Sequence, residues 1–131
     1  MNGVAKVEGF DPKSFTIMKL DLASFQSVRD FVVELKEFTA DKPLDRLVCN
    51  AAVYQPNLPD SKYTEDGHEQ QLQINHLSHF LLSSVLVSLH PIGKFENPRL
   101  IMVGSVTGND NTVGGGGVYP IADLKDPDPT W

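Results

Sequence analysis

Three short clusters of residues in this sequence carry side chains suited to a small-molecule site. Each follows directly after a run of apolar residues: Asp21-Leu22, Asn50-Ala51-Ala52 and Gly104-Ser105. The Asp21 carboxylate can accept a hydrogen bond from an amino group such as that of adenine. Residues as small as Ala51 and Ala52 let the backbone approach a cofactor closely, and the Ser105 hydroxyl can donate and accept hydrogen bonds. Each cluster alone is a weak indication of a binding site, so the prediction depends on the elements that bring the three together.

Other residues that are capable of chemistry favour structural roles. His76 and His79 lie near one helical face, but no Glu or Cys completes a metal-ligand pattern, so we predict no metal site. Gly114 to Gly117 does not stand between a strand and a helix, as a phosphate-binding loop would, and we predict a flexible loop there. Ser105 lacks the Gly-x-Ser-x-Gly pattern of hydrolases. Cys49 is expected to be a small buried residue with an inert thiol.

The elements that must position the three clusters follow from the spacing of apolar residues. Residues 15–20 predict a strand, and residues 44–49 predict a second one. Between them, Ser24 is a natural N-cap for an amphipathic helix of about four turns. The apolar positions that recur at helical spacing are Val28, Phe31, Val32, Leu35 and Phe38.

A second helix and a third strand complete the pattern. Residues 64–89 predict a helix that begins at a Thr64 cap, with Glu65 and Asp66 in its first turn, where the helix dipole favours carboxylates. Residues 99–103 predict a third strand, which is continuously apolar after Arg99, as in a sheet with helices on both faces. Strands that alternate with helices predict right-handed crossovers and a parallel sheet. The predicted fold is therefore α/β, a partial doubly wound parallel sheet.

This fold gives the three clusters a common location. In open parallel sheets, ligands bind outside the carboxyl ends of the strands. Each cluster follows a predicted strand, so all three are expected at the same edge of the sheet. After Gly108 the chain becomes rich in Gly, Asp, Asn and Pro and predicts a loop.

Composition excludes several classes of function. The net charge of −6 and the pI near 5.0 argue against nucleic-acid binding, which needs clustered Lys and Arg. A single cysteine excludes an intrachain disulfide framework. The longest apolar run, at residues 80–89, is about half of what a bilayer requires, so we expect no transmembrane helix. The N-terminal residues show no signal-peptide or transit-peptide pattern.

The order of four motifs resembles the short-chain dehydrogenase/reductase superfamily. They are LDL at residues 20–22, CNAA at 49–52, NHLSHF at 75–80 and RLIMVGSVTGN at 99–109. Within that superfamily, NAAVYQP at 50–56 and VGSVTGNDNT at 103–112 resemble the light-dependent protochlorophyllide reductases. The likeness extends from about Val4 to about Leu124, which is almost the whole chain.

The resemblance implies a cofactor and its contacts. Asp21 and Leu22 would contact the adenine ring of NADPH. Asn50, Ala51 and Ala52 would line the ribose and pyrophosphate side.

It also implies three residues at the catalytic end. Asn75 matches the helix asparagine of the family, which holds a water and orients the catalytic lysine through its backbone. Ser105 aligns with the serine that hydrogen-bonds the substrate or the catalytic tyrosine. Thr107 is a second hydroxyl at the same edge and an alternative for that role.

Two motifs of the family are not found among the 131 residues. Neither the glycine-rich turn nor the Tyr-x-x-x-Lys pair is present, and Tyr54, Tyr63 and Tyr119 each lack a Lys four residues later. Residues 1–131 are therefore expected to form a partial NAD(P)-binding domain that is inactive alone. The alternatives are a dark-active short-chain carbonyl reductase and a noncatalytic binding protein derived from the fold.

The resemblance further implies where the protein acts and with what. The substrate would be protochlorophyllide, reduced with light during chlorophyll biosynthesis. Hydride would come from the nicotinamide, and a proton from tyrosine or solvent. The expected location is the chloroplast, with peripheral association with plastid membranes and a homo-oligomeric state as further expectations.

Overall fold

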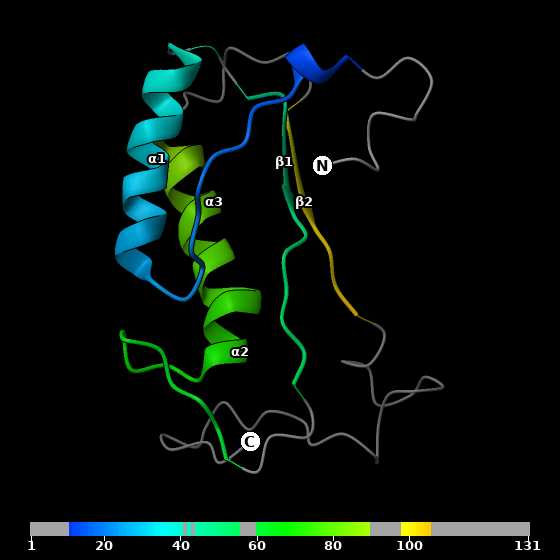
Figure 1. Ribbon diagram of the computed structural model, residues 1–131. Helices are drawn as coiled ribbons and strands as arrows, with labels where there is room; N and C mark the ends of the chain where they lie inside the picture. The colour runs from blue at the N-terminus through cyan, green and yellow to red at the C-terminus, as the bar shows by residue number, and fades with distance from the viewer. Residues whose placement is uncertain (1–10, 41, 43, 56–59, 90–97, 106–131) are drawn as a thin grey trace.

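The computed structural model describes residues 11–40, 42, 44–55, 60–89 and 98–105, and it places two helices beside a pair of parallel strands (Figure 1). The elements, in chain order, are the 3-10 turn η2 (Pro12–Ser14), α1 (Phe25–Thr39), β1 (Arg46–Cys49), α2 (Gln70–Leu72), the π-helical segment η3 (Gln73–Leu77), α3 (Ser78–Leu89) and β2 (Arg99–Met102). Helix α2, segment η3 and helix α3 follow one another without a break.

The sheet confirms the predicted parallel pairing. Strands β1 and β2 pair in register from Arg46 opposite Arg99 to Cys49 opposite Met102. The backbone N–H of Val103 extends the ladder by donating to the Cys49 carbonyl over 3.0 Å. The observed strands are one or two residues shorter than the predicted ranges, and they confirm a partial α/β fold.

Helix α1 begins at the predicted cap. The Ser24 side chain accepts a hydrogen bond from the Ser27 backbone N–H over 3.3 Å, which satisfies one of the free donors of the first turn. The helix ends at Ala40, which adopts the left-handed conformation (φ 48°) and donates its N–H to the Glu37 carbonyl.

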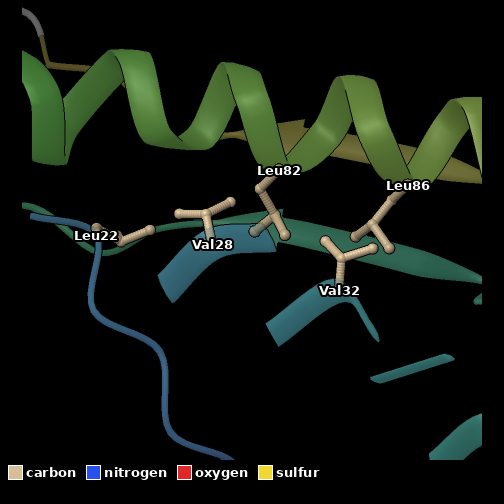
Figure 2. Close-up of a cluster of buried hydrophobic side chains, with 5 residues drawn as sticks. All are labelled: Leu22, Val28, Val32, Leu82 and Leu86. Atoms are coloured by element: carbon tan, nitrogen blue, oxygen red, sulfur yellow. The ribbon is translucent and has the colours of Figure 1, made fainter. Parts of the chain in front are cut away.

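A small apolar core joins the two helices. Val28 and Val32 of α1 face Leu82 and Leu86 of α3, and Leu22 from the preceding turn closes one end of the cluster (Figure 2). All five side chains are buried. Leu47 of β1 packs against this cluster, so the helices and the sheet share one core.

The predicted strand at residues 15–20 is not observed. The segment has no strand pairing, and the side chains of Phe15 and Ile17 are exposed. A strand is stabilised by hydrogen bonds to a neighbour, and within the described part of the chain only β1 and β2 form a sheet. Among the described residues, this segment therefore has no neighbouring strand to pair with.

The second helix starts six residues later than predicted. Residues 65–68 form a turn in which Gly67 adopts a positive φ of 82°, a conformation that interrupts a helix. The cap is Glu69, whose side chain accepts from the Leu72 N–H over 2.7 Å. Thr64 is therefore not the cap of this helix.

The helices lie on one side of the strand pair, where Leu47 of β1 packs against their core and all four residues of β2 stay exposed. The side chains of Val48, Ile101 and Val103 are 54%, 39% and 55% exposed. Both α1 and α3 lie on the other side of the pair (Figure 1). The expected cover on both faces is therefore absent from the described residues.

One described helical stretch, Gln70–Leu89, is long and apolar enough to cross a membrane by length and composition. Core helices of soluble proteins have the same properties. Leu82 and Leu86 pack on α1, and the buried Ser78 and His79 are hydrogen-bonded to loops. The described helix is longer than the apolar run at residues 80–89 on which the sequence expectation rests, and the absence of a transmembrane helix stays a prediction.

Candidate functional site

The predicted site residues gather at the carboxyl end of the sheet. The loop after β1, the end of β2 and the turn before α1 all lie toward the end at which α2 begins (Figure 1). Side chains from residues 71–79 are hydrogen-bonded to the loop after β1 and to the turn before α1. One helix therefore fixes two of the loops that the sequence proposes as cofactor contacts.

Asp21 has a structural role at its turn. Its Oδ1 accepts a hydrogen bond from the Ala23 N–H over 2.9 Å, and its own N–H donates to Ser27 Oγ over 3.0 Å. The residue is exposed, so the carboxylate remains accessible to a ligand. The geometry is compatible with the turn-forming role and with the predicted adenine contact.

Leu22 contributes to the core with its side chain, which is 8% exposed. Its carbonyl accepts a hydrogen bond from Ser78 Oγ over 2.6 Å. A contact of Leu22 with adenine would therefore involve the backbone, because the side chain packs against Val28 and its neighbours.

Residues 50–52 present a small, open backbone. Asn50, Ala51 and Ala52 are exposed, although Cys49 just before them is buried. The Ala51 carbonyl lies 2.8 Å from His79 Nε2, which fixes the path of the backbone. The surface beside Ala51 and Ala52 is thus free of bulky side chains of its own, as close approach of a cofactor requires.

Asn75 lies in the π-helical segment η3 and is bonded twice to the loop after β1. Its Nδ2 donates to the Val53 carbonyl, and its Oδ1 accepts from the Val53 N–H, both over 2.8 Å. Single turns of π-helix often occur at functional sites. The side chain of Asn75 is therefore committed to the loop, which leaves its backbone for the predicted role in holding a water.

The third cluster is only partly described. Gly104 and Ser105 follow β2 and are exposed, and a Cβ at Gly104 would meet no atom within 4 Å. Thr107 lies outside the described residues, as do the loop after Gly108 and the glycine run. The choice between Ser105 and Thr107 stays a prediction.

Cys49 is buried, as predicted, at 3% exposure. Burial raises the pKa of its thiol above the ordinary value of 9.0, because the thiolate would lose its hydration. A raised pKa agrees with an inert structural thiol rather than a nucleophile. Within the described ranges, no group of three or more His, Cys, Asp or Glu residues could hold a metal ion.

Sequence reasoning missed the polar residues that hold the loops. Ser78 and His79 are buried and bonded to Leu22 and Ala51. Gln71 Oε1 accepts from the Gln55 N–H over 2.8 Å. Polar residues inside an otherwise apolar helix could have indicated these contacts, because polar side chains that are buried require hydrogen-bond partners.

A second missed group connects the turn before α2 to α1. Asp66 Oδ2 accepts from the Phe25 N–H over 2.8 Å and from Gln73 Nε2 over 2.7 Å. Thr64 donates in turn to Gln73 Oε1. Gln73 is fully buried. The predicted first-turn carboxylate of one helix is therefore a cap for the other.

These features define a class of protein: a parallel α/β sheet whose strand-end loops present small and polar residues at one edge. The family model of the short chain dehydrogenases matches residues 3–121, and the chain belongs to this family. Membership confirms the predicted superfamily and implies a nicotinamide cofactor.

Particular relatives narrow the class. Protochlorophyllide reductase A, chloroplastic, of Arabidopsis thaliana is 48% identical over 122 residues, which are 93% of this chain and 29% of the relative. Protochlorophyllide reductase A, chloroplastic, of Hordeum vulgare is 46% identical over the same share of this chain and 31% of the relative. The reductase of Daucus carota is 48% identical, with 30% of its length covered. The predicted similarity to protochlorophyllide reductases is confirmed, and the chain spans less than a third of the length of these relatives.

Proposed function

We propose that this chain carries part of the NADPH site of a light-driven reductase that converts protochlorophyllide to chlorophyllide in chlorophyll biosynthesis. The observation that carries the proposal is the 48% identity to the Arabidopsis thaliana reductase over 93% of this chain. The substrate, the chloroplast location, a homo-oligomeric state and peripheral association with plastid membranes are parts of the same proposal.

The described residues fit a nicotinamide dinucleotide at the edge of the sheet. Asp21 offers an exposed carboxylate for the adenine amino group, and Leu22 offers its backbone. Asn50, Ala51 and Ala52 offer an exposed backbone with small side chains for the ribose and pyrophosphate. When bound, NADPH would supply the hydride for the reduction.

The contribution of this chain to the reaction would be positioning. Asn75 holds the loop after β1 through Val53, so its backbone is fixed at the π-helical segment where the predicted water would bind. Ser105, which is exposed at the end of β2, would orient the pigment or the proton donor. Thr107 is the alternative hydroxyl for that task.

The test uses the protein expressed from the longest open reading frame that contains residues 1–131. The purified protein is mixed with NADPH and protochlorophyllide in the dark and is then illuminated, and chlorophyllide is measured by its absorbance. We expect product only when light and NADPH are both supplied.

Two other outcomes contradict the proposal. Reduction of protochlorophyllide or of a carbonyl substrate in the dark would indicate a dark-active reductase. Binding of pigment or cofactor without product under light would indicate a noncatalytic binding protein.

A further inference from the structure

Two consecutive helical residues bind the carbonyl oxygens of two different loops. Ser78 Oγ donates to the Leu22 carbonyl over 2.6 Å, and His79 Nε2 lies 2.8 Å from the Ala51 carbonyl. Leu22 and Ala51 are far apart in sequence, and each belongs to a loop that follows an extended segment. The pair of side chains therefore sets the spacing between these loops.

The hydrogen bond to Ala51 fixes the role of one ring nitrogen of His79. A backbone carbonyl only accepts hydrogen bonds, so Nε2 of His79 carries a proton and donates to the Ala51 carbonyl. Nδ1 is buried and has no hydrogen-bond partner among the described residues. Among the described residues, the hydrogen bond to the Ala51 carbonyl is therefore the one polar contact of the His79 ring.

Ser78, like His79, is a buried polar residue of the helix that is hydrogen-bonded to a loop. It is fully buried, and its hydroxyl bonds to a loop rather than to its own helix. Ser83, one turn further along α3, is also buried but donates to the His79 and Phe80 carbonyls of the same helix. Two buried serines in one helix thus differ in whether they reach a loop.

We infer that Ser78 and His79 are positioning residues that hold the Leu22 and Ala51 carbonyls at the spacing which the adenine ring and the ribose-pyrophosphate part of a bound NADPH require. This inference rests on the proposed NADPH site and adds to it two residues that do not touch the cofactor. Their effect would pass through the loop backbones at residues 21–22 and 50–52.

The test measures NADPH affinity by fluorescence titration on the protein from the longest open reading frame that contains residues 1–131. Ser78→Ala is expected to weaken NADPH binding roughly three- to tenfold, the effect of about one lost hydrogen bond. Ser83→Ala, the matched control, removes a buried hydroxyl that bonds only within its helix and should leave affinity unchanged. Ser78→Cys, which keeps the size and a weak donor, replaces Ser78→Ala if that variant does not fold.

For His79 the comparison is between two replacements. His79→Gln keeps an N–H donor and should retain most of the affinity, whereas His79→Leu should weaken it by a similar three- to tenfold. Thermal unfolding of each variant separates loss of fold from loss of binding. A purely structural role would lower stability in His79→Leu without this difference in NADPH affinity.

The outcomes separate the inference from the function on which it rests. Absence of NADPH binding by the unsubstituted protein overturns the proposed function, and the inference with it. Normal NADPH binding that Ser78→Ala and His79→Leu leave unchanged, or that Ser83→Ala weakens equally, overturns only the positioning role.

Discussion

Single side chains of residues 75–79 connect their helix to the loop after β1 and to the turn before α1. Asn75 shows this most directly, because its amide both donates to and accepts from the backbone of Val53. Only an amide side chain offers a donor and an acceptor in this arrangement. The asparagine that resembles a catalytic residue of the family is therefore also a structural anchor in this chain.

Replacement of Asn75 by alanine tests the anchor. We expect Asn75→Ala to lower the free energy of unfolding by about 1–3 kcal/mol, because two hydrogen bonds are lost. The neighbouring His76→Ala is the matched control, since His and Asn have similar helix propensities and His76 is exposed. Urea unfolding followed by circular dichroism measures both variants, and equal stability of the two would show that the anchor contributes nothing.

At the scale of elements, the turn before α2 holds the start of α1. Asp66 accepts from the Phe25 N–H in the first turn of α1 and from Gln73 in the π-helical segment. These two hydrogen bonds, followed by the charges of His68 and Arg29, lower the pKa of Asp66 below its ordinary value of 3.8. The negative charge of the carboxylate also interacts favourably with the positive N-terminal end of the α1 dipole.

This contact predicts a pH dependence of stability. A carboxyl group whose pKa is lowered in the folded protein adds stability above its unfolded value of 3.8, and that stability is lost as the pH falls through the folded pKa. Asp66→Asn should be less stable than the unsubstituted chain at neutral pH and should lose less stability on acidification. Urea midpoints between neutral pH and values below 3.8 measure the difference.

The control for this prediction is the adjacent carboxylate. Glu65→Gln removes one negative charge from an exposed residue of the same turn. It should leave the acid dependence of the unsubstituted chain intact. If Glu65→Gln and Asp66→Asn flatten the profile equally, the effect belongs to net charge and not to the cap.

At the scale of the whole molecule, the sheet has an exposed apolar face. Val48 and Ile101 are partners in the β1–β2 register, and Val103 follows on the same side. Arg46 and Arg99 lie at the start of this face. Exposed apolar strands are prone to pair with other chains or to pack on them.

We therefore expect the 131-residue chain to associate with itself in solution. Val48→Lys should reduce association by placing a charge on the exposed face. Val33→Lys is the matched control, because Val33 is 59% exposed on α1, away from the strands. Sedimentation velocity over a range of concentrations measures both, and a monomeric unsubstituted chain at all concentrations would contradict the prediction.

Local patterns in the sequence determined the order of elements and part of their chemistry. Helical periodicity and the Ser24 cap predicted α1, and apolar runs predicted β1 and β2 to within two residues. The burial of Cys49 followed from its place in a strand. These features depend on neighbours within a few residues, so a sequence is sufficient to show them. The motifs likewise predicted the family, which the match over residues 3–121 confirms.

Only the tertiary structure decided which polar groups meet. Asp66 caps a helix that begins 41 residues earlier, and Ser78 reaches Leu22 across 56 residues. It also decided that residues 15–20, despite a strand-like pattern, have no paired neighbour in the described chain. Hydrogen bonds between distant segments depend on the packing that brings them within about 3 Å, and no local pattern specifies that distance.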